Sequence, residues 1–481
     1  IYLENVIPTA NGYQSVGKLI PTPLEAPTFG LIINQFPAIK PSQNDEVYMV
    51  TLVFHPGPDN YLASISGVSN WTVPTFIGTV GDPTQNQLIT YAIVRGVCYV
   101  LIRQVALSYL YEVEILADNT VQLTNVSGSV TGGVLTDAAV ICGAFNYLVV
   151  ISKTGQVNWS STTNPLDFVV SLVSGAGQAT PNGLYGGLTN AYATQFGFYM
   201  FSRIGVTVAQ YTGNSRYPWK FETVTDTNVV ESVATQDPNS YRVLSYDAAY
   251  NFYLLEGNLA RPVAPELGAY LRSNRKSYKY NYASHSLESI TPKDTVPTKV
   301  YCFYDRYLCV SVDAEFDGGK IYYNTIMVYD MKLSRYGRLR HRHTTLVVNQ
   351  DALNSQLTFA SIDKFTGALC VFHLTGFPSY TAGWDFSNSV VILGRFKYVR
   401  SRRIEIQEVA ISGQFNETNC VLLPGDNSQS FASAVTPSIV SNYEMYKSYN
   451  CRVEGDNVSV AVEGQFILDA LELTFSLGAA R

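Results

Sequence analysis

The chain has 481 residues, of which 15% are charged and 13% aromatic, and its formal net charge is −6. A chain of this length can bury a large core, and its low charge and many aromatics exclude intrinsic disorder. A coiled coil is excluded as well, because the residues that build long helices are not enriched. Since β-branched and aromatic residues pack well on pleated sheets, the composition predicts an all-β protein.

The chain begins at Ile1 with a mixed stretch that does not resemble a secretory leader. Its longest apolar run, near residues 138–151, contains Asn146 and is shorter than the roughly 20 residues that a membrane helix needs. We therefore expect a soluble protein with no membrane insertion by this chain. The seven cysteines are widely spaced, which favours buried reduced thiols, although a Cys420–Cys451 pair across a late hairpin stays open.

Short runs of β-branched and aromatic residues follow one another, separated by Gly, Asn, Asp and Pro. Core strands begin at Val97, Phe145, Phe196, Phe252, Tyr307 and Ala368, at spacings of 48, 51, 56, 55 and 61 residues. A four-stranded propeller blade takes about 40–50 residues. The period therefore predicts a β-propeller-like domain with about five or six irregular blades, although a sandwich with regular strand spacing would produce a similar pattern.

The two ends of the chain fall outside this period. Residues 1–40 are rich in proline, and residues 395–412 alternate apolar and polar side chains as a half-buried strand does. We therefore divide the chain into an N-terminal segment (1–44), a β-propeller-like domain (45–394) and a C-terminal β-sandwich-like domain (395–481). The N-terminal segment is expected to pack with the C-terminal domain and complete it.

The sequence lacks the motifs of common enzymes, such as GxxxxGK[ST], GxSxG and HExxH. His341 and His343 alternate on a strand, but their neighbours are cationic, which favours a solvated basic strand over a metal site. Residues 313–318 start like a calcium loop, yet Asn324 stands where that loop needs a bidentate glutamate. We therefore expect no metal, no cofactor and no enzymatic activity.

The charge is distributed unevenly along the chain. Residues 1–150 hold 4 Lys/Arg and 10 Asp/Glu, a balance of −6, whereas residues 272–403 hold 19 and 10, a balance of +9. The second region contains three basic clusters, namely Arg272, Arg275, Lys276 and Lys279; Arg335, Arg338, Arg340 and Arg342; and Arg395, Lys397, Arg400, Arg402 and Arg403. Basic residues among tyrosines suit non-specific contact with a nucleic-acid backbone. Solvated faces, or pairing with acidic patches of neighbouring subunits, are the alternatives for each cluster.

Five segments together carry a resemblance to a known family. They are Asn5-Val6-Ile7-Pro8 with Gly12-Tyr13; Asn158-Trp159 through Pro165-Leu166-Asp167-Phe168; Val206 through Gly213 with Tyr217-Pro218-Trp219-Lys220-Phe221; Val328-Tyr329-Asp330 with Arg335-Tyr336-Gly337; and the C-terminal Leu471 through Arg481. Their order and spacing resemble the tail nozzle, or packaged-DNA stabilisation, proteins of short-tailed bacteriophages, which are tail hub proteins of the podovirus type. The resemblance covers most of the chain, and its motifs are mainly structural.

The resemblance implies a structural virion protein of the phage tail, assembled in the host cytoplasm. Its copies would form a ring oligomer, a hexamer in this family, below the portal and the head-to-tail adaptor. The ring would enclose a channel, help to retain packaged double-stranded DNA and let it pass at ejection. It would also hold tail fibres or spikes and meet a tail tip or plug protein. No catalytic residue comes with the resemblance.

A DNA channel constrains where cations lie, because each phosphate contact adds affinity and a densely basic wall would stall a moving polyanion. We therefore expect the basic clusters to lie mostly away from the narrowest part of the channel, or to be balanced by acids there. The alternative function is a carbohydrate-binding or glycoside-cleaving β-propeller, which would need a cleft with two carboxylates roughly 5–10 Å apart. A scaffold propeller that binds proteins through its loops is a third reading.

Overall fold

The computed structural model describes residues 2–16, 20–21, 31–39, 47–54, 61–66, 75–78, 88–103, 107–116, 121–225, 235–236, 243–247, 249–272, 277–290, 299–303, 307–317, 320–343, 347–351, 356–362, 369–373, 389–396, 402–425, 434–443 and 445–480. Within these residues almost every element is a β-strand, and the exceptions are α1 (Pro265–Arg272) and the 3-10 turn η1 (Ser127–Ser129). None of the helices found there has the length and apolar character that crossing a bilayer requires.

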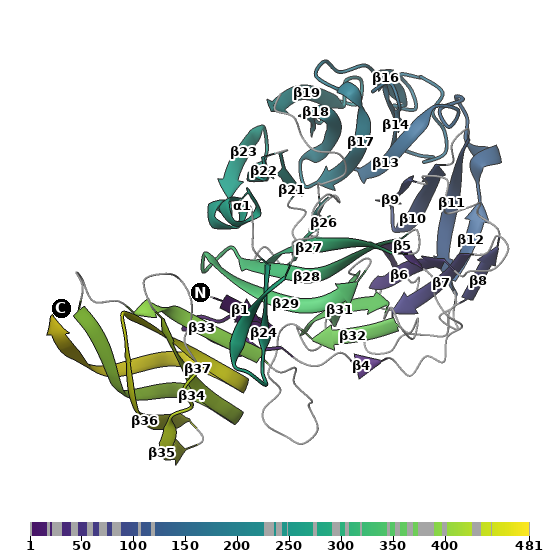
Figure 1. The fold of residues 1–481 in the computed structure, drawn as a ribbon. Coiled ribbons are helices and arrows are strands. Elements are labelled where there is room, and N and C mark those ends of the chain that lie inside the picture. The colour runs from purple at the N-terminus through teal and green to yellow at the C-terminus, as the bar shows by residue number, and fades with distance from the viewer. Residues whose placement is uncertain are drawn as a thin grey trace.

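Among the described residues, seven antiparallel groups of strands, numbered here as blades 1 to 7, are arranged as a β-propeller (Figure 1). Six of them are separate small sheets, and blade 6 is part of a larger sheet. Blade 1 contains β5 (Leu31–Ile39), β6 (Val47–Phe54), β7 (Tyr61–Ser66) and β8 (Thr75–Gly78); blade 2 contains β9 (Leu88–Val94), β10 (Val97–Arg103), β11 (Ser108–Ile115) and β12 (Val121–Asn125). Blade 3 contains β13 (Ala138–Ala144), β14 (Tyr147–Ser152), β15 (Val157–Trp159) and β16 (Gly177–Ala179); blade 4 contains β17 (Tyr185–Thr194), β18 (Gly197–Tyr211) and β19 (Trp219–Thr225).

The remaining blades follow in chain order. Blade 5 contains β20 (Thr235–Gln236), β21 (Val243–Tyr246), β22 (Phe252–Glu256) and β23 (Leu259–Val263); blade 6 contains β26 (Lys299–Phe303), β27 (Tyr307–Asp317), β28 (Lys320–Asp330) and β29 (Arg335–His343). Blade 7 contains β30 (Val347–Asp351), β31 (Gln356–Ile362), β32 (Leu369–His373) and the early strand β4 (Ile20–Pro21). A separate hairpin, β24 (Ser277–Asn281) and β25 (Ser286–Ile290), leaves the propeller between blades 5 and 6.

The apolar runs of the sequence become the middle strands of the blades. All six residues of β14 are buried, because both faces of this strand pack against neighbouring blades. The core between blades 3 and 4 includes Trp159, Phe198, Met200 and Trp219, and equivalent clusters lie between blades 2 and 3, 4 and 5, and 5 and 6. Blades 2 to 6 thus bury their facing surfaces against one another.

The ring is closed by the N-terminal region. Cys370 and Val371 of β32 pair with Pro21 and Ile20 of β4, so an early strand completes the last blade. The chain then enters β5 of blade 1, which also contacts β31 of blade 7. Backbone hydrogen bonds between sequence-distant strands therefore fasten the first blade to the last.

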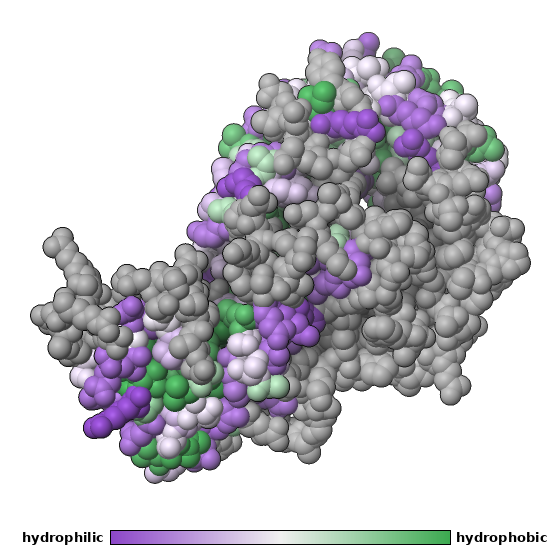
Figure 2. All heavy atoms as spheres, viewed as in Figure 1, coloured by the Kyte–Doolittle hydropathy of each residue, from purple (hydrophilic) through white to green (hydrophobic). Residues whose placement is uncertain are grey.

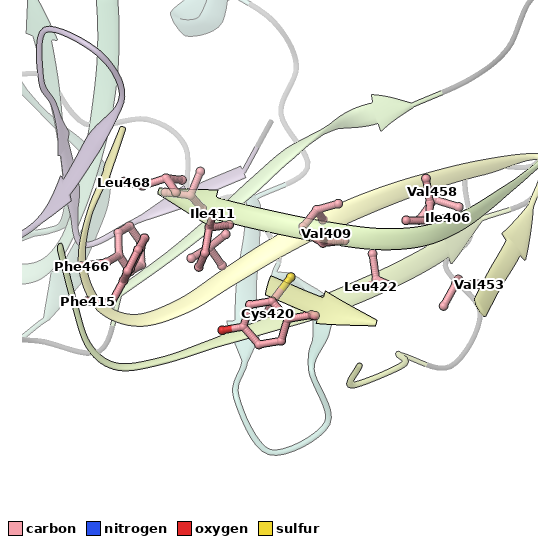
Figure 3. Packing of buried hydrophobic residues seen from close by; sticks show 14 of the residues in the cluster. Ile406, Val409, Ile411, Phe415, Cys420, Leu422, Val453, Val458, Phe466 and Leu468 are labelled. Atoms are coloured by element: carbon pink, nitrogen blue, oxygen red, sulfur yellow. The ribbon is translucent and has the colours of Figure 1, made fainter. Parts of the chain in front are cut away.

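The C-terminal domain contains β33 (Ser389–Phe396), β34 (Arg402–Gly425), β35 (Ser438–Tyr443), β36 (Tyr446–Gly455) and β37 (Asn457–Ala480). The 24-residue strands β34 and β37 pair along most of their length and bend together at irregularities in the register. At the bend, a Cβ on Gly413 would lie 1.9 Å from the Ile467 carbonyl oxygen, so the close approach requires glycine. The bent sheet encloses a core that includes Val409, Phe415 and Phe466 (Figure 3).

The first strands of the chain join the two domains. β1 (Tyr2–Glu4) pairs with β33, β2 (Val6–Pro8) pairs with β29 of blade 6, and β3 (Tyr13–Ser15) pairs with β37. β2 and β3 also pair with each other. One sheet therefore runs from blade 6 through the N-terminal strands into the C-terminal domain.

The predicted fold class, an all-β propeller with a C-terminal β-domain that the N-terminal segment completes, is confirmed. The structure has seven blades where about five or six were predicted, because β5–β8 form a blade before the first predicted core strand, at Val97. Pairing also refines the predicted boundaries. Strands β4 and β5 of segment 1–44 belong to the propeller, and β33, which begins within range 45–394 and crosses its end, belongs to the C-terminal domain. Cys420 and Cys451 carry free thiols, so the pair that the sequence left open is not formed.

Gly337 marks the point where β2 crosses β29. A Cβ added there would lie 2.2 Å from the Val6 carbonyl oxygen and 2.9 Å from the Ile7 Cα. We expect Gly337→Ala to lower the thermal unfolding midpoint, at a cost of about 1–3 kcal/mol, because the backbone of β2 must move away. Gly128→Ala, whose added methyl meets no atom within 4 Å, is the control. Equal midpoints for the two variants would contradict this account.

Candidate functional site at the joint between the propeller and the C-terminal domain

A polar network lies where the hairpin β24–β25, blade 6 and the C-terminal domain meet. We call this network the joint, and its side chains are Tyr2, Glu4, Tyr280, Tyr282, His285, Asp313, Arg338, Arg340 and Glu463. Around it, apolar residues of β1, β33, β34, β37 and the hairpin form one small core. Tyr2 and Tyr280 lie within that core, with ring centroids 6.4 Å apart.

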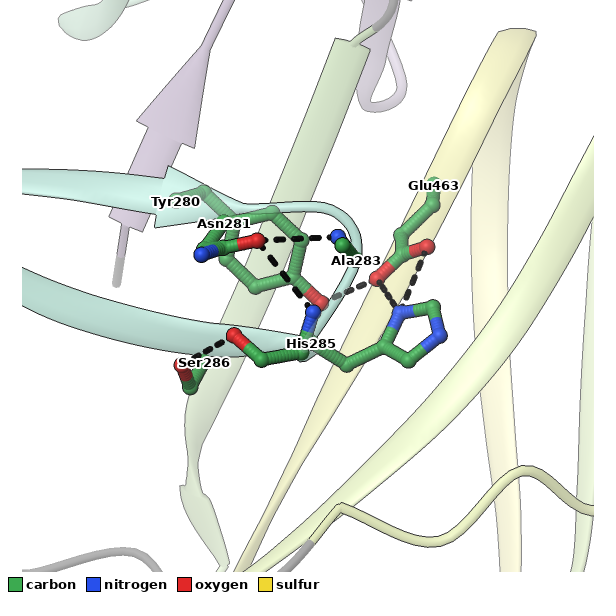
Figure 4. A network of polar contacts seen from close by, with 7 residues as sticks. Tyr280, Asn281, Ala283, His285, Ser286 and Glu463 are labelled. Carbon is green, nitrogen blue, oxygen red and sulfur yellow. Dashed lines mark hydrogen bonds and ion pairs between the residues drawn. The ribbon is translucent and has the colours of Figure 1, made fainter.

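Glu463 of β37 is 6% exposed and accepts hydrogen bonds from the hairpin (Figure 4). The Tyr280 hydroxyl donates to its Oε1 atom. The His285 Nδ1 atom lies 2.9 Å from Oε1 and 3.1 Å from Oε2. His285 sits in the turn of the hairpin with a φ of 49°, a conformation in which histidine is enriched. The hairpin therefore supplies two partners to a carboxylate that is withdrawn from water.

Glu4 of β1 is the second buried carboxylate and is 4% exposed. The Tyr2 hydroxyl donates to its Oε2 atom, and the Arg340 Nε atom lies 3.2 Å from the same oxygen. The Tyr2 hydroxyl also accepts a 2.9 Å hydrogen bond from the backbone N–H of Tyr280. A continuous chain of polar contacts therefore runs from Arg340 of blade 6 through β1 to the hairpin and Glu463.

Arg338 occupies the neighbouring position on blade 6 and is 6% exposed. Its NH2 atom lies 3.7 Å from the Asp313 Oδ2 atom, and its guanidinium carbon lies 5.5 Å from the centroid of the Tyr2 ring. A guanidinium above an aromatic face is attracted by the ring quadrupole, and more strongly where water is excluded. Arg338 is therefore a structural cation of the joint.

The tyrosines of the joint are held in their neutral form. Burial raises the pKa of the Tyr2, Tyr280 and Tyr282 hydroxyls well above the usual range, and the nearby Glu4 and Glu463 carboxylates raise it further. Neutral hydroxyls are donors, so they satisfy the carboxylates over the whole physiological pH range.

The structure separates the basic residues that the sequence grouped. Arg340 and the buried Arg338 belong to the joint, whereas Arg335 of the same predicted row is exposed. Arg272 is exposed, and its NH1 atom donates to the Ala249 carbonyl oxygen; Lys279 and Arg335 are also exposed. The other predicted side chains lie outside the described part of the chain; they are Arg275, Lys276, Arg342, Arg395, Lys397, Arg400, Arg402 and Arg403.

Sequence reasoning missed the acidic side of the joint. Glu4 and Glu463 each stand among apolar neighbours, in Tyr2-Leu3-Glu4 and in the run that leads from Val458 to Glu463. A single carboxylate inside a strand that is otherwise apolar is a signal for a buried, partnered acid, because an unpaired one would be costly to bury. This signal identifies the buried acid but does not predict which residues pair with it.

The joint can hold two domains in one orientation, since its contacts are directional and come from four separate segments. In the range that the structure describes, no three His, Cys, Asp or Glu side chains gather as a metal site would require. Asp313, which opened the calcium-like segment, lies in β27 and faces Arg338. The side chains of His341 and His343 lie outside the described residues.

Comparisons with known proteins leave the family open. No family model matches the chain, and no curated protein matches it. Among solved structures, it is similar to YCF48 bound to D1 peptide, with 10% identity, a TM-score of 0.39 and coverage of 76% of this chain and 97% of that one. It is also similar to the WD40 β-propeller domain of Doa1, with 9% identity, a TM-score of 0.40 and coverage of 75% and 97%. At these scores the likenesses carry no functional conclusion.

The pairing of Arg340 with Glu4 predicts that removing one partner lowers the stability more than removing both. Arg340→Gln deprives a buried carboxylate of its guanidinium and should cost about 2–4 kcal/mol, seen as a lower thermal unfolding midpoint. The double variant Glu4→Gln/Arg340→Gln should recover part of that loss. As a control, Arg452→Gln removes an exposed cation 3.9 Å from Glu405 and should leave the midpoint nearly unchanged. A double variant no more stable than Arg340→Gln would contradict the pairing.

The buried tyrosines predict alkaline instability. Their pKa is raised in the folded state, so the folded protein keeps protons that the unfolded chain loses above about pH 10. This stabilisation is complete below that pH and is lost as the pH rises further. Tyr280→Phe should lower the midpoint at pH 7, because Glu463 loses a donor, and should flatten the fall between pH 9 and 11. Tyr217→Phe, at an exposed position, is the control. Unchanged pH dependence in Tyr280→Phe would refute this assignment.

Proposed function

We propose that the protein is a structural virion subunit of a phage tail nozzle, or tail hub, whose copies form a ring around the DNA channel. In this proposal the ring sits below the portal and the head-to-tail adaptor in the tail of a short-tailed phage. It helps to retain packaged DNA, lets it pass at ejection, and anchors fibres or spikes and a tip or plug protein.

The observation that carries the proposal is where the segments of the resemblance lie in space. Asn5 has a φ of 54° and binds three separate segments. Its side-chain oxygen accepts from the Arg340 N–H at 3.0 Å, and its carbonyl oxygen accepts from the Val16 N–H at 3.1 Å and the Ser389 hydroxyl at 2.9 Å. Gly337 makes room for the β2 backbone. Two of the five segments thus meet beside the joint, where they serve architecture.

Two further segments lie in neighbouring blades. Trp159 and Trp219 belong to the same core between blades 3 and 4, and the Trp159 Nε1 atom donates to the Gly175 carbonyl oxygen at 2.9 Å. These residues fix loops and blade faces, and they do not converge on a shared group of acids or nucleophiles. The use of these four segments for construction favours a wall component over a catalyst.

The charges of the described residues support passage of DNA without tight binding. Two arginines of the most basic region are compensated by Asp313 and Glu4 within the joint. The two buried carboxylates, Glu4 and Glu463, face protein groups, which does not favour the glycosidase alternative. In this proposal the chain acts as a wall component, because several copies together enclose the channel.

Negative-stain electron microscopy tests the proposal. The purified protein, alone or mixed with the portal–adaptor complex of the same virus, should form a ring with six-fold symmetry. A particle that stays monomeric in both conditions would overturn the proposal. Binding or cleavage of oligosaccharides by that monomer would establish the carbohydrate-active alternative in its place.

A further inference from the structure

The two buried carboxylates of the joint differ in their cationic partners. Glu4 lies 3.2 Å from the Nε atom of Arg340, and a guanidinium is charged at every physiological pH. Among the described residues, the ion-pair partner of Glu463 is His285, with 2.9 Å between Nδ1 and Oε1. Histidine is the side chain that ordinarily gains and loses its charge between pH 5 and pH 8. One carboxylate therefore has a permanent counter-charge, whereas the other has a conditional one.

The geometry of His285 allows its charge to change while its hydrogen bond remains. Nδ1 faces both carboxylate oxygens of Glu463, so this nitrogen carries the proton of the neutral ring. The side chain is 33% exposed, and its Nε2 edge is turned away from Glu463 (Figure 4), so water can deliver a second proton there. That proton adds a Coulomb attraction to the existing hydrogen bond, in a place where little water screens it.

The joint lacks one positive charge when His285 is neutral. Its other charged side chains are three carboxylates and two guanidiniums, a balance of −1; they are Glu4, Asp313, Glu463, Arg338 and Arg340. The hairpin β24–β25 adds Lys279 and Glu288, which stand opposite each other and cancel. The three tyrosines of the joint are neutral. A proton on His285 therefore brings the balance to zero.

The hairpin is held to the C-terminal domain by side chains rather than by strand pairing. β24 and β25 form a two-stranded sheet of their own among the described residues, and such a hairpin has little stability by itself. Its order depends on the contacts of Tyr280 and His285 with Glu463, and on the small apolar core around them. Elements with few stabilising contacts are the first to open locally. The strength of the Glu463 contacts therefore determines how often the hairpin opens.

We propose that the hairpin β24–β25 is a pH-sensitive latch on the C-terminal domain, closed while His285 is charged and loosened when it is neutral. A closed latch that binds this proton more tightly than the open one is stabilised at low pH. That stabilisation is lost as the pH rises through the range in which histidine titrates. β1 and β3 still pair with β33 and β37, so the C-terminal domain stays attached while its orientation becomes less fixed. The latch goes beyond the proposed ring and does not depend on it.

Hydrogen–deuterium exchange of the full chain tests the latch. Peptides from residues 277–290 should be protected about tenfold more at pH 6 than at pH 8, once the intrinsic pH dependence of exchange is removed, because a charged donor is replaced by a neutral one. Peptides from the blade 5 hairpin, residues 252–263, contain no histidine and serve as the internal control. Equal protection of residues 277–290 at both pH values, or the same change in the control peptides, would overturn the latch.

Three variants assign the effect to the two side chains. His285→Gln keeps an N–H donor for Glu463 and cannot gain a charge, so its hairpin should exchange at both pH values as the wild type does at pH 8. Glu463→Gln removes the charge to which His285 responds and should also abolish the pH dependence. Lys279→Gln removes an exposed cation of the same hairpin and should retain it. Unfolding midpoints establish that each variant folds, and if only one of the first two does, that one decides. A pH dependence that survives in a folded His285→Gln or Glu463→Gln protein would overturn the proposal, whatever the oligomeric state of the protein.

Discussion

The molecule depends on the strand pairings of its first 21 residues. β1 pairs with the C-terminal domain, β2 with blade 6, β3 with β37, and β4 with blade 7. Each pairing involves only one to three residue pairs, so none would be stable by itself. Because their partners lie more than 300 residues away, each pairing closes a long loop and depends on the rest of the fold to hold the partner strand in place. The segment thus both closes the propeller and joins the second domain to it.

The polar character of the joint explains how the C-terminal domain is held in one orientation relative to the propeller. An apolar contact between the hairpin β24–β25 and the C-terminal domain would tolerate sliding, whereas Glu463 is satisfied only when Tyr280 and His285 both reach it. The Coulomb attraction of such buried groups is largely offset by the loss of their hydration, so their contribution lies more in geometry than in net stability. A change of one partner is costly because the other partner stays buried.

The sequence predicted the fold class because its signals are local. Runs such as Val97–Arg103 and Tyr147–Ser152 are buried on both faces, and their apolar character and spacing are visible without knowing their partners. Pairing of short strands is not local: Ile20–Pro21 and Tyr2–Glu4 carry too few residues to display a pattern, so their assignment to different domains could not be predicted. Only the basic side of the joint could be predicted. Its arginines are close together in the sequence, whereas its acids lie in distant strands.

The distribution of charge along the chain differs from its distribution in space, because folding brings residues together that are distant in the sequence. The acidic balance of residues 1–150 and the basic balance of residues 272–403 suggest two surfaces of opposite sign. Folding instead brings Glu4 of the first region against Arg340 of the second, and Asp313 against Arg338 within the second. Part of the positive balance is thereby neutralised inside the protein before any partner is met. A chain built in this way can carry many cations in its sequence and still expose fewer of them on its surface.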